Sequence, residues 1–394
     1  MRISTRMLVI VLLAHAESAL GGSRHWEAKA PNKQTNPSPD YPATDVLNAT
    51  SSLLKRAISI DNRPGNNALP RIWPNKKIRY CFVEPDHVIR GLWDLARNAW
   101  ATLEANGFSY EEVTNREQCE AEKATILHIH YNNHGKLATT LGIPSIDEKW
   151  NKENPDRKVE GPFIHLSDLQ GIGQDNIAAN VAHELGHAWG LVHEHQNPFF
   201  WELTPEDARN GWAFPQTKGM VSKFKTSDFK CDRMKDYKEA HDAVRAKIAE
   251  AIADGKELLR GELEVDLERL CISRGAAFKH RFLASEWLPY SNTGGFVMDE
   301  EFDPLSLMLY PSGAGGIGSG NNRAQVMVYK DGAPIPNRLA PTNRDIARLL
   351  ALYSDTGSST PAEPHTSKSS KLKNAFRKAR IFLNRAGDTV SGLC

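Results

Sequence analysis

Cysteine is scarce in this sequence, with 5 residues in a chain of 394. So few cysteines cannot hold together a chain of this length, so a packed hydrophobic core must carry the fold and disulfides can only add to it. An excess of one charge is also lacking, because 49 Lys and Arg oppose 48 Asp and Glu, for a formal net charge of +1. Without a basic excess, we expect no nucleic-acid partner.

Long apolar runs are lacking as well. No stretch reaches the roughly 18 consecutive apolar residues of a membrane-spanning helix, so we expect no transmembrane segment. The apolar run at 7–13 follows Arg2 and Arg6 and precedes Ala-His-Ala. A charged start, a short apolar run and small residues are typical of a secretory signal peptide. The sequence therefore predicts a signal peptide over residues 1–16 and a secreted, extracellular protein.

Both ends of the remaining chain differ in composition from its centre. Residues 17–56 are polar and proline-rich and end in Lys55-Arg56, which resembles a site for a processing protease of the secretory pathway. We interpret 17–56 as a propeptide that is removed by cleavage after Arg56, although an accidental Lys-Arg pair is the alternative. Residues 356–394 begin as a linker and continue as a basic tail, either poorly ordered or an amphipathic helix.

The central segment, 57–355, alternates between strand and helix patterns. Alternating apolar residues predict strands near 77–82, 125–131 and 161–166. Apolar spacings of three, four and seven predict one long helix from Ile89 to Leu103. Four histidines in this sheet region lack a partner at metal-ligand spacing, so we expect them to be ordinary polar or packed residues: His128, His130, His134 and His165.

A charged insertion follows in the second half of the segment. Its apolar stripe is interrupted at Asp254-Gly255, which predicts a helical hairpin over about 231–271. A continuous solvated coil is the other interpretation. The two ends of a hairpin lie close together, so Cys231 and Cys271 are expected to pair; other pairings remain open. The full expectation is Cys231–Cys271 and Cys81–Cys119, with Cys394 unpaired.

Residues 183–195 read HELGHAWGLVHEH and carry the strongest chemical signal in the chain. His183 and His187 are four residues apart, which places both on one face of a helix. Gly190 permits a left-handed turn that ends this helix and brings His193 round as a third ligand. Three protein ligands leave one position for water, as in a catalytic zinc site. The sequence therefore predicts one Zn²⁺ per chain.

Two other residues of this stretch need an interpretation. Glu184 projects beside the three histidines, near enough to hold a metal-bound water without being a ligand. His195 follows His193 by only two residues, so it cannot reach the same metal, and we interpret it as a supporting or surface residue.

These residues resemble a known superfamily. The spacing is similar to the metzincin signature, and Glu194 together with Ser306-Leu-Met-Leu-Tyr310 resembles the astacin family. The resemblance covers roughly 72–355. It implies an α+β, metzincin-like zincin fold: a twisted, mostly antiparallel sheet, an active-site helix and an irregular C-terminal subdomain. It also implies a secreted zinc metalloendopeptidase that acts on proteins or peptides.

The resemblance assigns a role to each matching residue. Glu184 would be the general base, Tyr310 would stabilise the transition state, Met308 would underlie the ligands, and Glu194 would meet the mature N-terminus. Astacin propeptides place an aspartate on the zinc, for which Asp40 and Asp45 are the candidates here. Leu309 stands where astacins usually have histidine, which leaves the subsite preference open.

Two other functions are compatible with the same residues. The chain could be a catalytically silent protein that keeps zinc as a scaffold for a partner, although such a site does not need Glu184. It could also be a zinc hydrolase with a substrate other than a peptide. The natural substrate and the oligomeric state are not indicated by the sequence.

Overall fold

The computed structural model describes residues 58–60, 71–84, 86–153, 155, 158–216, 219–291 and 296–354. The expected signal peptide, leader and basic tail lie outside these residues, as do Ala57 and Cys394. Within the described part, no helix is both long and apolar enough to cross a membrane. Helices and short strands are mixed along the chain, which is the expected α+β class.

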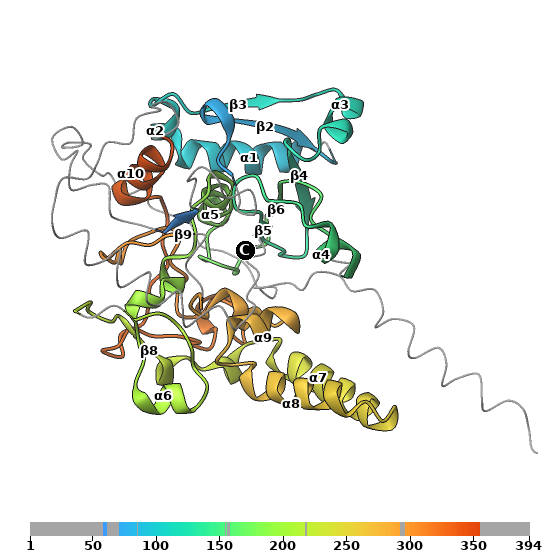
Figure 1. The fold of residues 1–394 in the computed structure, drawn as a ribbon. Helices are drawn as coiled ribbons and strands as arrows, with labels where there is room; N and C mark the ends of the chain where they lie inside the picture. Colours follow the sequence, from blue (N-terminus) through green and yellow to red (C-terminus); the bar gives the residue numbers. More distant parts are fainter. Residues whose placement is uncertain are drawn as a thin grey trace, which may run out of the picture.

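A five-stranded sheet forms the upper half of the molecule (Figure 1). Its order is β3-β2-β4-β6-β5. One face is apolar because alternate residues point to the same side; Ile78, Ile129 and Ile164 are among its fully buried members. The strand bounds are β2 Lys77–Phe82, β3 Ser109–Glu112, β4 Leu127–Asn132, β5 Ala138–Thr139 and β6 Phe163–Ser167.

The expectation of a mostly antiparallel sheet is wrong. The pairs β2/β3, β2/β4 and β4/β6 are parallel, and β5/β6 alone in this sheet is antiparallel. Parallel neighbours require a crossover, which the helix between β2 and β3 provides here. Alternation along a strand shows which residues face the core, but it contains no information on the direction of the neighbouring strand.

Two long helices cover one face of the sheet. α1 (His87–Ala99) and α5 (Ile177–Trp189) pack against each other, and both contact β6 (Figure 1). The single long helix expected up to Leu103 is interrupted at Trp100, which has non-helical dihedral angles, and continues as α2 (Ala101–Glu104). The predicted apolar stripe is nevertheless buried throughout: Ile89, Leu92, Trp93, Ala96, Trp100 and Leu103.

The chain after α5 builds the lower half around a second core (Figure 1). Nine of the 22 buried residues in this core are aromatic. The half is less regular than the upper one, as the resemblance implies. Its helices and strands, with the two short helices of the upper half, are α3 Arg116–Ala121, α4 Glu148–Glu153, β7 Trp201–Glu202, α6 Pro205–Arg209, β8 Phe224–Lys225, α7 Tyr237–Ala253, α8 Glu257–Arg269 and α9 Arg274–Lys279.

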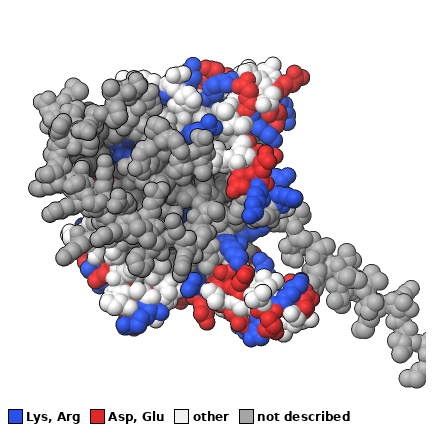
Figure 2. Space-filling view, in the orientation of Figure 1, with Lys and Arg blue, Asp and Glu red and all other residues white. Residues whose placement is uncertain are grey.

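The expected helical hairpin is present as α7 and α8, which project from the lower half (Figure 1). Val244 on α7 and Leu263 on α8 are buried, whereas Ile252 near the tip is 54% exposed. Acidic and basic side chains alternate over the surface of the hairpin (Figure 2), as in the pair Lys238–Asp242. The apolar stripe therefore serves packing at the base of the hairpin and reaches solvent at its tip.

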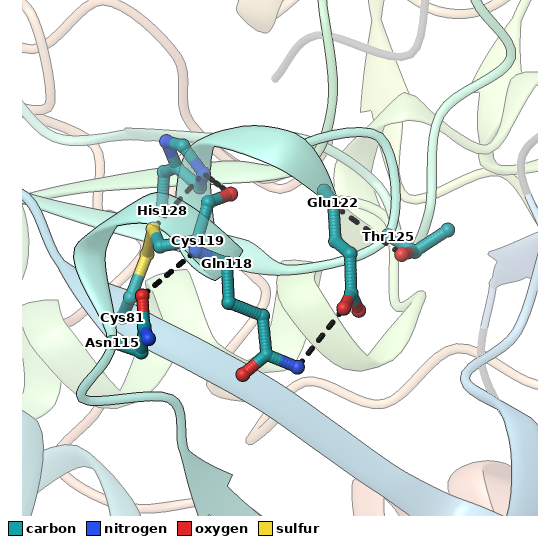
Figure 3. The surroundings of a disulfide bond; sticks show 7 residues. All are labelled: Cys81, Asn115, Gln118, Cys119, Glu122, Thr125 and His128. Atoms are coloured by element: carbon teal, nitrogen blue, oxygen red, sulfur yellow. Dashed lines mark hydrogen bonds between the residues drawn. A yellow bond between two sulfur atoms is a disulfide. The ribbon is translucent and has the colours of Figure 1, made fainter.

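Both expected disulfides are found in the structure. Cys231 and Cys271 are joined at the base of the hairpin, with 5.7 Å between their Cα atoms. Cys81 on β2 is joined to Cys119 on α3, with 6.3 Å between their Cα atoms (Figure 3). Both distances are within the range of ordinary disulfides.

The first and last described elements meet beside α5. β1 (Ser59–Ile60), a strand not expected from the sequence, pairs with β9 (Phe296–Val297) and is fully buried. The last helix, α10 (Asn343–Leu352), returns from the lower half and packs near α2 and β1. Its Arg348 donates two hydrogen bonds to the hydroxyl of Ser59. The first and last described elements therefore close one side of the core.

The Cys231–Cys271 bond closes 40 residues of chain, so its loss should free much conformational entropy in the unfolded state. We expect the double change Cys231→Ser, Cys271→Ser to lower the free energy of unfolding by about 3–4 kcal/mol, measured by urea denaturation. Cys394→Ser, which removes the cysteine expected to be unpaired, should leave the midpoint unchanged. Peptide mapping without reduction that joined Cys81 to Cys271 would contradict both pairings.

Candidate metal centre and active site

The three histidines of the motif converge at the end of α5. Asn176 caps the helix by accepting a hydrogen bond from the backbone N–H of Ala179. Gly190 ends it with a left-handed φ of 107°, as the sequence predicts. A short 3-10 helix, Glu194–Gln196, then follows directly after His193. The turn at Gly190 thus carries His193 back to the face of α5 that holds His183 and His187.

The three side chains present their Nε2 atoms to one point. The Nε2–Nε2 distances are 3.1 Å for His183–His193, 3.0 Å for His183–His187 and 3.0 Å for His187–His193. All three residues are buried, and their ring nitrogens lie close enough together to bind one metal ion. Tetrahedral zinc with ordinary Zn–N bonds separates its nitrogen ligands by about 3.3 Å, which is close to this spacing.

The opposite ring nitrogens fix the tautomers. His183 Nδ1 lies 2.8 Å from the carbonyl oxygen of Leu307, and His187 Nδ1 lies 2.8 Å from that of Leu191. His193 Nδ1 lies 2.9 Å from Oε1 of Gln196, whose amide nitrogen donates elsewhere. Oxygen acceptors require a proton on each Nδ1, so each neutral ring offers a lone pair at Nε2.

The charge state of the rings also suits a metal. Burial lowers the pKa of His183 to about 4, and burial lowers the pKa values of His187 and His193 well below the ordinary value. The three imidazoles are therefore neutral near pH 7. Three lone pairs that face one another at this distance cannot hydrogen-bond among themselves, whereas a shared cation would satisfy all three. The residues present therefore fit a tetrahedral metal ion.

Glu184 lies on α5 next to this group and is also buried. Its Oε2 accepts a hydrogen bond of 2.5 Å from the hydroxyl of Thr139 on β5. Burial raises the pKa of Glu184 to about 8; the Glu286 carboxylate adds to this shift, and the Thr139 hydrogen bond opposes it. A carboxyl group with this pKa can exchange a proton near neutral pH.

Tyr310 and Met308 come from the segment far along the chain that the motif analysis singled out. The ring centroid of Tyr310 lies 4.3 Å from that of His193 and 5.6 Å from that of His183. Met308 lies against α5 at Gly186, where an added Cβ would come within 2.7 Å of the methionine sulfur. Gly186 is therefore needed for this close approach. Both residues are placed beside the histidine group.

Glu194 directly follows His193 and is buried. Its Oε1 accepts from the backbone N–H of Asp303, and its own N–H donates to the carbonyl of Met308. Burial, with added contributions from Asp345, Asp303 and Asp299, raises the pKa of Glu194 well above its ordinary value. Such a carboxyl group would be ionised more easily if a further cation lay nearby.

His195 does not join the three ligands. Its Nε2 lies 2.8 Å from the carbonyl of Glu286, and its ring stacks on His193 with 5.2 Å between centroids. It is fully buried, so the surface alternative is wrong and the supporting one holds. The sheet histidines are also separate, since His130 stacks on His165 across β4 and β6.

A second group has metal-binding residue types: Cys81, Cys119 and His128. Figure 3 shows that the two sulfur atoms are bonded to each other and that His128 points toward them. His128 Nε2 lies 3.4 Å from the sulfur of Cys119. A disulfide offers no thiolate, so in this form the group does not provide a metal site.

Several residues of the centre were not found from the sequence. Thr139, Gly186 and Gln196 lack a motif of their own, and Leu307 and Leu191 act through backbone oxygens that any residue has. Gly186 had one usable signal, because a glycine inside a helix usually has a packing reason. Gln196, three residues after His193, had the spacing of a neighbour on a helical turn.

Comparisons with known proteins give only distant likenesses. No family model matches the chain, and no curated protein matches it. Among solved structures it is similar to high choriolytic enzyme 1, a hatching enzyme zinc-protease from Oryzias latipes (medaka fish). The identity is 13% and the TM-score 0.38, over 75% of this chain and 98% of that one.

A structure of myroilysin is also similar, with 13% identity and a TM-score of 0.34 over 72% of this chain and 95% of that one. A crystal structure of myroilysin aligns with 10% identity and a TM-score of 0.31, over 75% and 98% of the two chains. At TM-scores this low the likenesses support no conclusion about this chain, so its function is inferred from its own residues.

Loss of any one of the three converging imidazoles should empty the metal site. We expect His183→Ala, His187→Ala and His193→Ala each to weaken zinc binding by more than about 100-fold, the upper range for supporting residues. His195→Ala should retain the metal. The measurement is zinc per mole of protein after dialysis, with circular dichroism to establish that each variant is folded. Loss of zinc from a folded His195→Ala variant would show that the ligand assignment is wrong.

Proposed function

We propose that this protein is a zinc metalloendopeptidase, similar to astacins, that hydrolyses peptide bonds in proteins or peptides. The observation that carries the proposal is the convergence of three unprotonated Nε2 atoms beside a buried carboxyl group, Glu184. A site that served only structure would not need an acidic group that is placed next to the metal but is not a ligand. The two disulfides agree with a secreted protein.

The chemistry follows from the residues around this point. When bound by the three histidines, zinc would act as a Lewis acid and would acidify a water molecule. Glu184 takes a proton from the attacking water and delivers it to the leaving amine. Thr139 holds the carboxyl group in place by its hydrogen bond. Tyr310 donates its hydroxyl proton toward the oxyanion that develops on the scissile carbonyl.

The sheet edge suggests how a substrate would bind. β5 is the last strand in the order of the sheet, and Thr139 on this strand contacts Glu184. An extended peptide can add to such an edge by main-chain hydrogen bonds. The proposal therefore places the substrate along β5, with its scissile bond above α5. Because this contact is made through the backbone, it favours a peptide over the other hydrolase substrates.

A catalytically silent scaffold is the second candidate. Both interpretations use the three histidines as zinc ligands. The scaffold interpretation gives Glu184 and Tyr310 no function. Casein hydrolysis that a chelator abolishes and zinc restores would support the peptidase. Zinc binding without hydrolysis of casein, gelatin or a peptide library would favour the scaffold.

Activation by processing would use the buried strand β1. The predicted new N-terminus, Ala57, precedes β1 by two positions, and Ile58 accepts a hydrogen bond from the N–H of Val192. This segment therefore runs beside the turn that carries His193. We include in the proposal that cleavage after Arg56 frees the amine of Ala57, which then approaches Glu194.

The local charge balance supports this step. Glu194, Asp299, Asp303 and Asp345 are all buried. Burial raises the pKa of Glu194 and the negative charges of the three aspartates add to this, whereas the hydrogen bond from the backbone N–H of Asp303 opposes it. One oxygen of Asp299 is buried without a hydrogen-bond partner among the described residues. Arg348 is near enough to stabilise the ionised form of Asp299. A free α-amine would add a second positive charge to a region with an excess of buried acidic groups.

Removing the proton acceptor should stop catalysis without emptying the site. We expect Glu184→Gln to keep zinc and fold and to lose kcat by at least about 10²–10⁴-fold, the range for general acid–base catalysis. Tyr310→Phe should lose about 10²-fold, as for one oxyanion donor. Steady-state hydrolysis of a fluorogenic peptide measures both. Wild-type rates in zinc-loaded Glu184→Gln would rule out the mechanism.

A retained leader should inhibit the enzyme. A tethered segment acts at an effective concentration of about millimolar, so even a weak contact of the leader with the metal site suffices. We expect Arg56→Ala, which prevents processing, to hydrolyse casein at least about 10-fold more slowly than the processed enzyme. Mass spectrometry establishes that the leader is retained.

The same background identifies the blocking residue. Asp45→Asn or Asp40→Asn, added to Arg56→Ala, should restore hydrolysis if that aspartate occupies the metal. Equal rates in the processed enzyme and in uncleaved Arg56→Ala would show that the leader is not inhibitory.

A further inference from the structure

A buried carboxylate on the last helix organises the segment that contacts the metal ligands. Asp345, in the first turn of α10, is fully buried. Its Oδ1 accepts from the hydroxyl of Ser306 at 2.7 Å, and its Oδ2 accepts from the backbone N–H of Leu307 at 3.0 Å. Oδ2 also accepts from the N–H of Thr342, the cap of the helix, at 2.9 Å. Every one of these contacts uses the carboxylate as an acceptor.

The segment held in this way reaches His183 directly. The carbonyl of Leu307, whose N–H is bound by Asp345, accepts the proton of His183 Nδ1 at 2.8 Å. The hydroxyl of Ser306 also accepts from the N–H of Met308, and the carbonyl of Met308 accepts from the N–H of Glu194. Asp345 therefore holds the peptide unit before Leu307 directly. Through the hydroxyl of Ser306 it also holds the peptide unit after Leu307, whose carbonyl fixes the tautomer and the ring direction of His183.

We propose that Asp345 is a positioning residue of the metal centre, which tightens zinc binding by fixing the Leu307 carbonyl against His183. Outer residues that orient a ligating histidine contribute to metal affinity because they reduce the freedom that the ring must lose on binding. The contact is indirect, through the backbone of Leu307. The inference rests on the proposed zinc site but does not require that the protein cleave peptides.

Asp345 also caps α10, so a plain loss of helix stability must be separated from a loss of metal affinity. Thr342 and Asp345 form a reciprocal capping box. α6 begins with the same device, formed by Thr204 and Asp207, and the second oxygen of Asp207 accepts from the hydroxyl of Thr226. Asp207 contacts none of the three metal histidines. Asp207→Asn is therefore a matched control for the capping role alone.

The test compares zinc dissociation constants, measured by competition with a chelator of known affinity. Asp345→Asn should weaken zinc binding by about 10–100-fold, because an amide cannot accept the same set of hydrogen bonds. Asp207→Asn should bind zinc as the wild type does, although both variants unfold at a lower temperature in the metal-free form. Ser306→Ala, which leaves the capping box intact, should weaken zinc binding in the same direction by a smaller factor.

Each outcome has a separate meaning. If the wild type binds no zinc, the proposed function fails and this inference fails with it. If the wild type binds zinc and folded Asp345→Asn binds it equally well, the inference alone is wrong. If Asp345→Asn does not fold, Ser306→Ala decides: a wild-type affinity in that variant would overturn the positioning role, and a weakened one would support it.

Discussion

Three imidazole lone pairs that point at one another within a buried site are the constraint on which the rest of the centre depends. Each ring can hold this direction only because its other nitrogen donates to an oxygen that is fixed elsewhere: the carbonyls of Leu307 and Leu191 and the side chain of Gln196. In the absence of a cation, this arrangement would leave buried polar atoms facing one another without partners. A metal ion bound by the three Nε2 atoms would supply the partner that each lone pair lacks.

The acceptors come from three distant parts of the chain, and this explains much of the architecture. Leu191 lies in the turn at Gly190, Gln196 in the short helix that follows, and Leu307 in the segment that returns from the lower half. That segment is held in turn by Asp345 on α10, while Met308 fills the space left open at Gly186. A histidine group built in this way is coupled to the packing of α10 and of the buried strand β1.

Much of this centre was predictable from local patterns. The four-residue spacing of His183 and His187 and the left-handed Gly190 are properties of one helix and its end, so they can be interpreted without a tertiary structure. The hairpin was also predictable, because its apolar stripe and its break lie within a single segment. The pairing of Cys231 with Cys271 followed from the same local argument.

What the sequence by itself determined was therefore the identity of the histidines, the helix that presents them and the acidic residue between them. Only the tertiary structure decided the parallel pairing of the sheet, the burial of β1 and the hydrogen bonds that connect Asp345 through Leu307 to His183. The physical reason is that side-chain periodicity reports which face is buried, whereas strand direction and backbone acceptors depend on neighbours far away in the chain. Every residue has the same backbone carbonyl, so the residue type at Leu307 does not indicate that its carbonyl orients His183.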